Sequence, residues 1–157
     1  MTNLRARIIA GILVTGYENE TRQAIDATRA IEYEYGEGAN RSNFLFEFTG
    51  AITTSATHTY TLDDATQLFD AFGDGIDASQ VKAVVLINTG NTELTIGGTV
   101  DGVFASTVKA GAVYMVATPS IVGYAMVVDS AGYRLTVVNK SGSAAGSYSL
   151  VIIGELA

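Results

Sequence analysis

The strongest constraint on the fold is a two-residue alternation of apolar and polar positions that begins near residue 43 and returns in segment after segment. Phe44, Phe46 and Phe48 fall on one side of an extended chain, which is the pattern of a half-buried β-strand. The other segments with strand character are 57–62, 81–88, 92–97, 103–108, 113–117, 123–128, 133–139 and 148–153. The body of the chain is therefore expected to consist of strands.

Turns rich in glycine and serine separate these segments, and the strands begin at intervals of roughly ten residues, as in sandwiches and jelly rolls. No segment of helical length lies between the strands of the second half, which argues against a parallel sheet built from βα units. We therefore predict an all-β fold: an antiparallel β-sandwich, jelly-roll-like, with about eight to ten strands.

One short helix is expected near residues 64–72, within the segment Asp63–Phe72. An aspartate at its start could cap the first turn, Leu68 and Phe72 would share one face, and Gly73 would end it. The next segment, Val81–Asn88, is apolar on both faces except at Lys82. It is expected to be a central strand covered on both sides.

The first 41 residues differ from the rest in charge, because they hold five of the nine basic residues, whereas residues 42–157 carry a net charge of −6. We therefore divide the chain into an N-terminal arm or docking segment, 1–41, and a sandwich domain, 42–157. The stretch 21–31 could form a short helix or an extended arm. The alternation that follows in Glu32–Tyr35 favours the extended form.

The apolar run Ile8–Val14 is much shorter than the roughly 20 residues of a membrane-spanning helix, and a poor cleavage site follows it. It is expected to be a strand or arm that is buried, preferably against a neighbouring subunit. The predicted interface residues are Ile8, Ile9, Ile12 and Leu13, together with Arg5 and Arg7, whose guanidinium groups could pair with an acidic surface of a partner.

Composition excludes several classes of function. The net charge of −7 argues against broad contact with nucleic acid or an anionic membrane. The absence of cysteine removes disulfides, thiol catalysis and cysteine-based metal sites, and a single histidine removes multi-histidine sites. A mean hydropathy of +0.27 with only 16% charged residues predicts that another subunit covers some of the surface, so a homo-oligomer is expected.

No catalytic, cofactor-binding or metal site is predicted. His58 is interpreted as a strand residue at the surface or an interface, because no nucleophile motif accompanies it. The acidic cluster is interpreted as capping and solvated loop, with a calcium site as the less favoured alternative; its members are Asp63, Asp64, Asp70, Asp74 and Asp77. Glu47 and Glu93, inside strands of the body, have outward parity and do not suggest a glycosidase pair.

A series of short motifs, in a fixed order, resembles a family of small virion-associated structural proteins of tailed bacteriophages. The motifs are Gly38–Asn43, Asp70–Gly73, Val81–Ala83, Leu94–Gly98, Gly123–Ala125 and Tyr148–Gly154. The family's corresponding segments read "GANQAD", "DAFG…VK", "L-x-V-G-G", "PDATGYAV" and "YDIVIIG". The resemblance covers about residues 36–154.

The resemblance implies a β-sandwich that decorates or joins parts of a virion and has no catalytic residues. The expected function is a head decoration (cement) protein or a head or tail accessory protein, assembled in the bacterial cytoplasm. Its partners would be itself, with a trimer as one arrangement, and the major capsid protein or other virion proteins, with no nucleic acid and no membrane. A carbohydrate- or receptor-binding β-sandwich of a phage fibre is the alternative.

Overall fold

The computed structural model describes residues 5–18, 21–99, 105–120, 123–124 and 133–157, and between residues 10 and 29 it describes the course and pairing of the backbone. The described chain is all-β, with antiparallel sheets, and contains no helix. It follows that none of the described residues lies in a helix able to cross a membrane.

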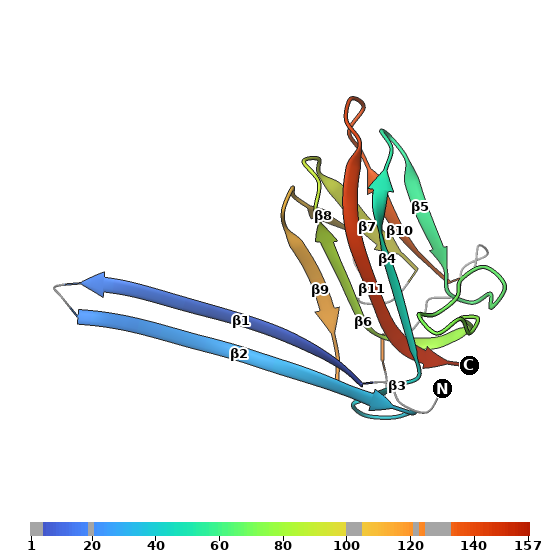
Figure 1. Ribbon diagram of the computed structural model, residues 1–157, viewed down its shortest axis with the longest axis horizontal. Helices are drawn as coiled ribbons and strands as arrows, with labels where there is room; N and C mark the ends of the chain where they lie inside the picture. Colours follow the sequence, from blue (N-terminus) through green and yellow to red (C-terminus); the bar gives the residue numbers. More distant parts are fainter. Residues whose placement is uncertain (1–4, 19–20, 100–104, 121–122, 125–132) are drawn as a thin grey trace.

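The described residues of the body form two four-stranded antiparallel sheets (Figure 1). The first sheet has the order β4 (Phe44–Ile52), β11 (Gly146–Leu156), β6 (Ala78–Asn88) and β9 (Val113–Ala117). The second has the order β5 (Thr57–Thr61), β10 (Arg134–Asn139), β7 (Leu94–Gly98) and β8 (Ser106–Val108). Consecutive strands are rarely neighbours, so each sheet is assembled from segments far apart in sequence.

Both sheets contribute to one hydrophobic core. From the first sheet Phe44, Leu86 and Leu150 are fully buried, and from the second Ile96 and Leu135 meet them in the same cluster. Each is an alternate residue of its strand, as the two-residue pattern predicted. Burying one such side chain contributes roughly 1.5–3 kcal/mol, so this shared core is the main source of the body's stability.

A long β-hairpin projects from one end of the body (Figure 1). Its strands are β1 (Arg5–Glu18) and β2 (Thr21–Tyr35), paired without interruption from Arg5–Glu34 to Glu18–Thr21. The short strand β3 (Arg41–Ser42) then pairs in parallel with the end of β2. The preference for an extended chain over a helix at residues 21–31 is confirmed, because β2 includes all of them.

The helix predicted near residues 64–72 is wrong, because the segment folds as a series of turns. The Asp64 carboxylate accepts hydrogen bonds from the Thr66 backbone N–H and hydroxyl, at 2.9 and 2.6 Å. The Asp70 carboxylate accepts from the N–H groups of Phe72 and Asp74, both at 2.9 Å. Aspartate side chains that bond to nearby backbone in this way compete with helical hydrogen bonds and favour turns.

Strand β6 is central in the first sheet, as predicted, but its two faces are not equally covered. Val81–Val84 are all buried, whereas Val85 is half-buried and Ile87 is 40% exposed. Lys82, the one charged residue of this otherwise apolar segment, has no exposed surface. Of the predicted strands 103–108 and 123–128, only Ala105–Val108, Gly123 and Tyr124 lie within the described residues; Ser106–Val108 forms β8, and Tyr124 makes an isolated pair with Val81.

Candidate interaction surface

The base of the hairpin packs on the outer face of the first sheet. Tyr33 is fully buried there against Ala83 and Ile153, and Ile8 and Ile31 lie half-buried beside them. This group is called the base cluster; its remaining members are Ala6, Leu45, Ala117 and Val151. The hairpin is thus fixed to the body by side chains of β1 and β2 that lie on one face of the ribbon.

Tyr33 also anchors the base through its hydroxyl group. The hydroxyl lies 3.0 Å from the Thr118 carbonyl oxygen and 3.2 Å from that of Lys82, and can donate to either. Burial raises the pKa of Tyr33 to about 12, because the charged phenolate would lose its hydration. The hydroxyl therefore remains a donor at any physiological pH.

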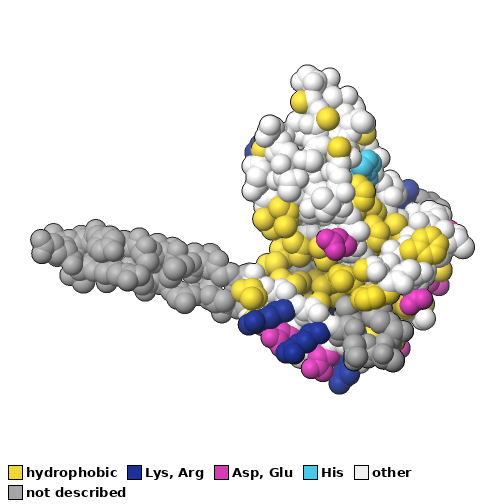
Figure 2. Space-filling model, in the orientation of Figure 1, with side chains coloured by type: hydrophobic (Ala, Val, Ile, Leu, Met, Phe, Trp, Pro, Cys, Tyr) yellow, Lys and Arg dark blue, Asp and Glu magenta, His cyan; other side chains and the backbone are white. Residues whose placement is uncertain are grey.

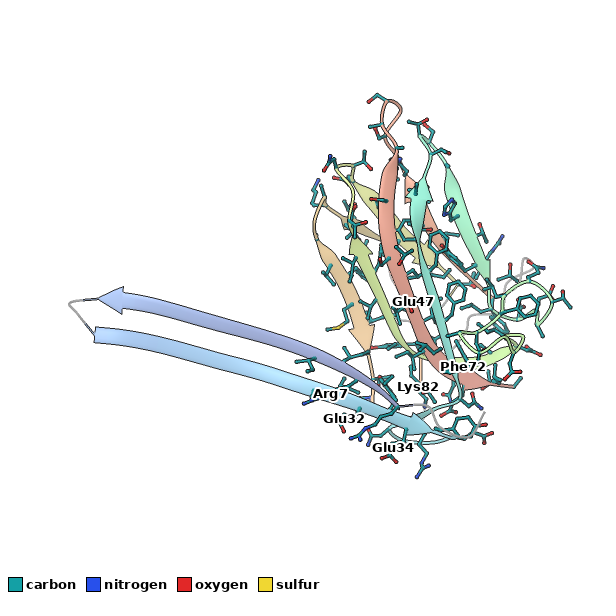
Figure 3. All side chains as sticks on the ribbon, in the orientation of Figure 1. Arg7, Glu32, Glu34, Glu47, Phe72 and Lys82 are labelled. Carbon is teal, nitrogen blue, oxygen red and sulfur yellow. The ribbon has the colours of Figure 1, made fainter. Side chains whose placement is uncertain are left out.

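A buried ion pair holds the segment after the hairpin. The Lys82 ammonium lies 3.2 Å from the Glu155 carboxylate and donates to the Ser120 carbonyl oxygen at 2.8 Å. Glu155 accepts in addition from the Gly38 N–H at 2.8 Å and from the Gln80 amide. Since a buried charge needs both a partner and hydrogen bonds, this arrangement fixes the turn at Gly38 relative to β6 and β11. Figure 3 shows Lys82 at this end of the body, beside the hairpin base.

The six predicted interface residues all lie in β1, but the structure gives them different environments. Ile8 contacts its own body in the base cluster, whereas Ile9 is 56% exposed. Arg5 and Arg7 both pair with Glu32 of the same hairpin, at 3.5 and 3.2 Å, and are exposed. Ile12 and Leu13 occupy register positions farther along the ribbon, opposite Ala27 and Asp26.

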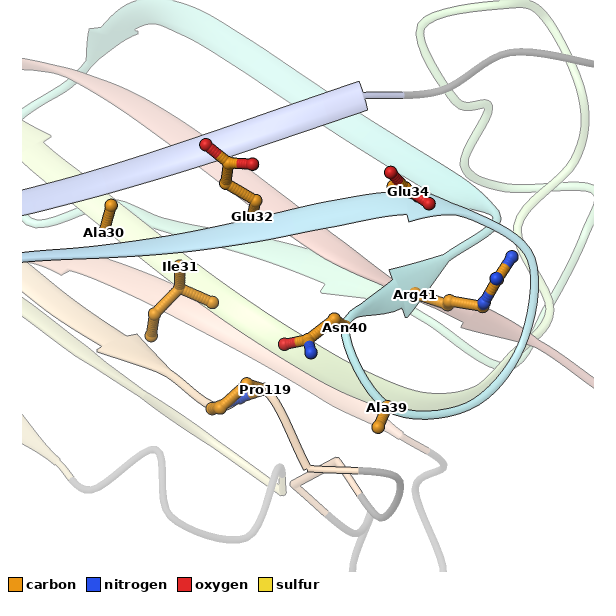
Figure 4. Close-up of a pocket in the computed structure, with 8 residues that line it drawn as sticks. All are labelled: Ala30, Ile31, Glu32, Glu34, Ala39, Asn40, Arg41 and Pro119. Atoms are coloured by element: carbon orange, nitrogen blue, oxygen red, sulfur yellow. The ribbon is translucent and has the colours of Figure 1, made fainter.

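Beside the hairpin base lies a hollow of about 640 Å³ (Figure 4). Its lining residues are Ala30, Ile31, Glu32, Glu34, Ala39, Asn40, Arg41 and Pro119. Glu32 is already paired with two arginines, and the Arg41 guanidinium donates to the Tyr35 carbonyl oxygen at 3.1 Å. The lining thus combines two carboxylates, Glu32 and Glu34, with the Arg41 guanidinium and the Asn40 amide.

The outer face of the first sheet continues beyond the row under the hairpin base as two further rows, which the hairpin leaves largely uncovered; Val151, which also packs against the base cluster, lies at the boundary. In the first row Val151 lies between Glu47 and Val85, and Val85 lies beside Met115. In the second row Ile87 lies beside Val113. Val113 is 60% exposed, Ile87 40% and Met115 38%. We call these residues, Glu47, Val85, Ile87, Val113, Met115 and Val151, the outer apolar face.

Figure 2 shows hydrophobic side chains gathered over the middle of the first sheet, with an acidic side chain beside them. Glu47 stands on this face over β4 and β11 (Figure 3). Contiguous apolar surface is unusual on a protein that stays alone in water, and it commonly marks a site of contact.

His58 lies in strand β5, as predicted; it is half-buried, and its Nδ1 atom lies 2.6 Å from the Tyr148 hydroxyl. That hydroxyl lies 2.5 Å from the hydroxyl of Tyr60, and the Phe48 ring packs against all three side chains. Burial and the neighbouring Tyr60 hydroxyl raise the pKa of Tyr148. His58 thus belongs to an aromatic hydrogen-bonded group with no carboxylate or activated nucleophile.

Within the described ranges, no three acidic or histidine side chains come together as metal ligands would. Asp64 and Asp70 serve the turns described above, and the bonds from Thr66 and Gln67 lower the pKa of Asp64. Glu47 is exposed, as its parity predicted, and Glu93 pairs with Lys109 on the surface.

Sequence reasoning missed the Lys82–Glu155 pair and the outer apolar face. Each of the two charged residues is isolated in an apolar strand, Lys82 in VKAVVLIN and Glu155 after VIIG. Two isolated opposite charges of this kind are a usable signal of a buried ion pair. The apolar residues on both faces of the strand 81–88 were a signal for the outer apolar face. The sequence did not show which of the two faces the hairpin leaves uncovered.

Comparisons of the chain with models of protein families, with curated proteins and with solved structures found no match.

Proposed function

We propose that this protein is a non-enzymatic structural subunit of a bacteriophage virion, either a head decoration (cement) protein or a head or tail accessory protein. It would hold the particle together through contacts between subunits, with the major capsid protein or another virion protein as its partner. The strand order of the body is the observation that carries the proposal.

The strand order of the body supports a jelly-roll arrangement. Numbered one to eight from β4 to β11, the strands form one sheet with the order 1-8-3-6 and a second with the order 2-7-4-5. Two interlocked Greek keys produce this order, and the jelly roll is a fold of viral capsid proteins and of lectins. The strand order therefore supports a virion role and agrees with the motifs that resemble phage structural proteins.

The surface supports the same proposal. The outer apolar face and the projecting hairpin are features of a subunit that works through contact. The carbohydrate-binding alternative would need exposed aromatic rings: Tyr33, Tyr60 and Tyr148 are buried, whereas Tyr35, Phe69 and Phe72 are exposed.

The test is to raise an antibody against the recombinant protein and apply it, with gold label and by immunoblot, to virions purified from the phage that encodes the chain. We expect the protein in stoichiometric amounts on mature particles, and weaker particles when its gene is deleted. Its absence from purified virions would contradict the proposal. Binding of the protein to defined sugars on a glycan array, without presence in the shell, would favour the alternative.

A further inference from the structure

The outer face of the first sheet is covered in one row and uncovered in the next two. The covered row runs across all four strands and lies under the hairpin base; its residues are Leu45, Ile153, Ala83 and Ala117. The two uncovered rows hold Val85, Met115, Ile87 and Val113. Within one molecule, therefore, one face of the hairpin packs on the outer face of this sheet.

That same face of the hairpin continues outward with apolar residues. Side chains on a strand alternate between faces, and paired residues share a face. The pairs Ile12–Ala27 and Val14–Ile25 therefore have the same parity as Ile8–Ile31 and Ala6–Tyr33, which form the base. From Ala6–Tyr33 to Gly16–Gln23, the only charged residue with this parity is Arg29.

The hairpin cannot bring this outer part onto its own body, because it runs away from the sheet (Figure 1). The nine residues of β1 beyond Ile9 extend about 30 Å at the usual rise of a strand. Four strands, spaced about 4.8 Å apart, make a sheet roughly 15–20 Å wide. The projecting part is therefore long enough to cross the first sheet of another molecule.

We propose that the outer part of the hairpin of one copy covers the outer apolar face of a second copy. The contact would repeat, between two molecules, the packing that the hairpin base already makes within one. The charges are also complementary, since Arg29 has the register parity of this face and the sheet presents Glu47. The inference goes beyond the virion proposal and does not depend on it, because it concerns the purified protein alone.

The first test measures self-association of the full chain by sedimentation equilibrium. We expect oligomers, and a weakening of association of roughly tenfold or more for Val113→Asp, which places a charge at the most exposed apolar position of the proposed contact. The matched control is Phe72→Asp, because Phe72 is 51% exposed but lies in the loop after β5. We expect the control to associate like the unchanged protein.

A second variant removes the proposed occupant and retains the base cluster. Residues 10–29 are replaced by Asn-Gly, which joins the paired residues Ile9 and Ala30 by a two-residue turn. We expect this variant to be monomeric. Circular dichroism and thermal melting establish that the body is folded.

Cysteine crosslinking locates the contact in the full-length chain and does not require the shortened hairpin to fold. The sequence has no cysteine, so each introduced thiol is unique. Ile12→Cys is mixed with Val113→Cys under mild oxidation, and a mixed disulfide is expected. Two control mixtures should form little mixed disulfide. The first combines Leu13→Cys, which has the opposite parity on the ribbon, with Val113→Cys. The second combines Ile12→Cys with Thr59→Cys, which lies on the second sheet.

Three outcomes overturn the inference: a monomeric full chain at high concentration, a folded shortened variant that still oligomerises, or equal crosslinking in the test and control mixtures. None of them bears on the presence of the protein in virions, so failure here is distinguishable from failure of the proposed function.

Discussion

At Gly154 the backbone of β11 comes so close to β6 and to the Phe44 ring that no side chain has room. A β-carbon at this position would collide with the Gln80 carbonyl oxygen, where the register between β11 and β6 shifts. We expect Gly154→Ala to lower the free energy of unfolding by about 1–3 kcal/mol, as overpacking does. Denaturant unfolding measures it. Gly142→Ala, at an open position, is the control and should be close to neutral.

Tyr33 makes stability depend on pH in the alkaline range. Its pKa of about 12 in the folded protein exceeds the ordinary value of 10.0 that the unfolded chain has. Below pH 10 both states keep the proton and the stabilisation is complete. Between pH 10 and 12 the unfolded chain loses the proton first, so the free energy of unfolding falls by about 1.4 kcal/mol per pH unit.

Tyr33→Phe removes this contribution. The variant should lose about 1 kcal/mol at neutral pH, from its missing hydrogen bond, and should show a shallower decline between pH 10 and 12. Urea titrations at several pH values measure both effects. Equal slopes for the variant and the unchanged protein would show that Tyr33 ionises normally. Tyr60 and Tyr148, whose pKa values burial also raises, are present in both proteins and cancel.

At the scale of elements, the Lys82–Glu155 pair connects β6, β11 and the turn after the hairpin. Lys82→Met leaves the Glu155 carboxylate buried without its cation, and we expect a loss of about 3–5 kcal/mol. Adding Glu155→Gln to that variant should recover part of the loss. Lys109→Met removes the cation of the exposed pair with Glu93 and is the control, for which we expect almost no change. Thermal melting of all three variants measures these changes in stability.

The elements also show where sequence patterns suffice. The strands β4 and β6 could be predicted from local alternation and from apolar runs. A strand with one buried face needs apolar residues at alternate positions, and a strand with two buried faces needs them at most positions. The helix at residues 64–72 failed because its apolar spacing was outweighed by aspartates that bond to neighbouring backbone groups. Helix spacing over one or two turns does not reveal that competition.

For the whole molecule, stability should be uneven. Strand β11 lies between β4 and β6, and its alternate side chains fill the core, whereas the hairpin beyond Ile9 projects from the body. Hydrogen exchange should be slowest for β11 and β6 and fast for residues 10–18 in dilute solution. Mass spectrometry after pulse labelling measures it. Equal protection of the hairpin and β11 in a monomer would contradict the expectation.

The sequence does not reveal which residues that are far apart along the chain come into contact in the fold. Lys82 and Glu155, or Tyr33 and Thr118, meet only because distant strands are brought together, and no local pattern records such pairs. Charge and an apolar run predicted an N-terminal arm or docking segment over residues 1–41, and part of that segment forms the hairpin β1–β2. The contact of the hairpin base with its own body, through Ile8 and Tyr33, depends on the tertiary arrangement and could not be predicted from the sequence.

The pairing of β4 with β11 has a consequence for the order of events in synthesis. The first strand of the body, β4, pairs with its last strand, β11, so the first sheet stays open until β11 has left the ribosome. The hairpin is closed by local contacts and can form within microseconds, long before the surface beneath its base exists. Folding of the body should then be slow, in the millisecond-to-second range typical of non-local β topologies. The nascent chain would meanwhile display a finished ribbon with an apolar side, and that interval is when premature association is most dangerous.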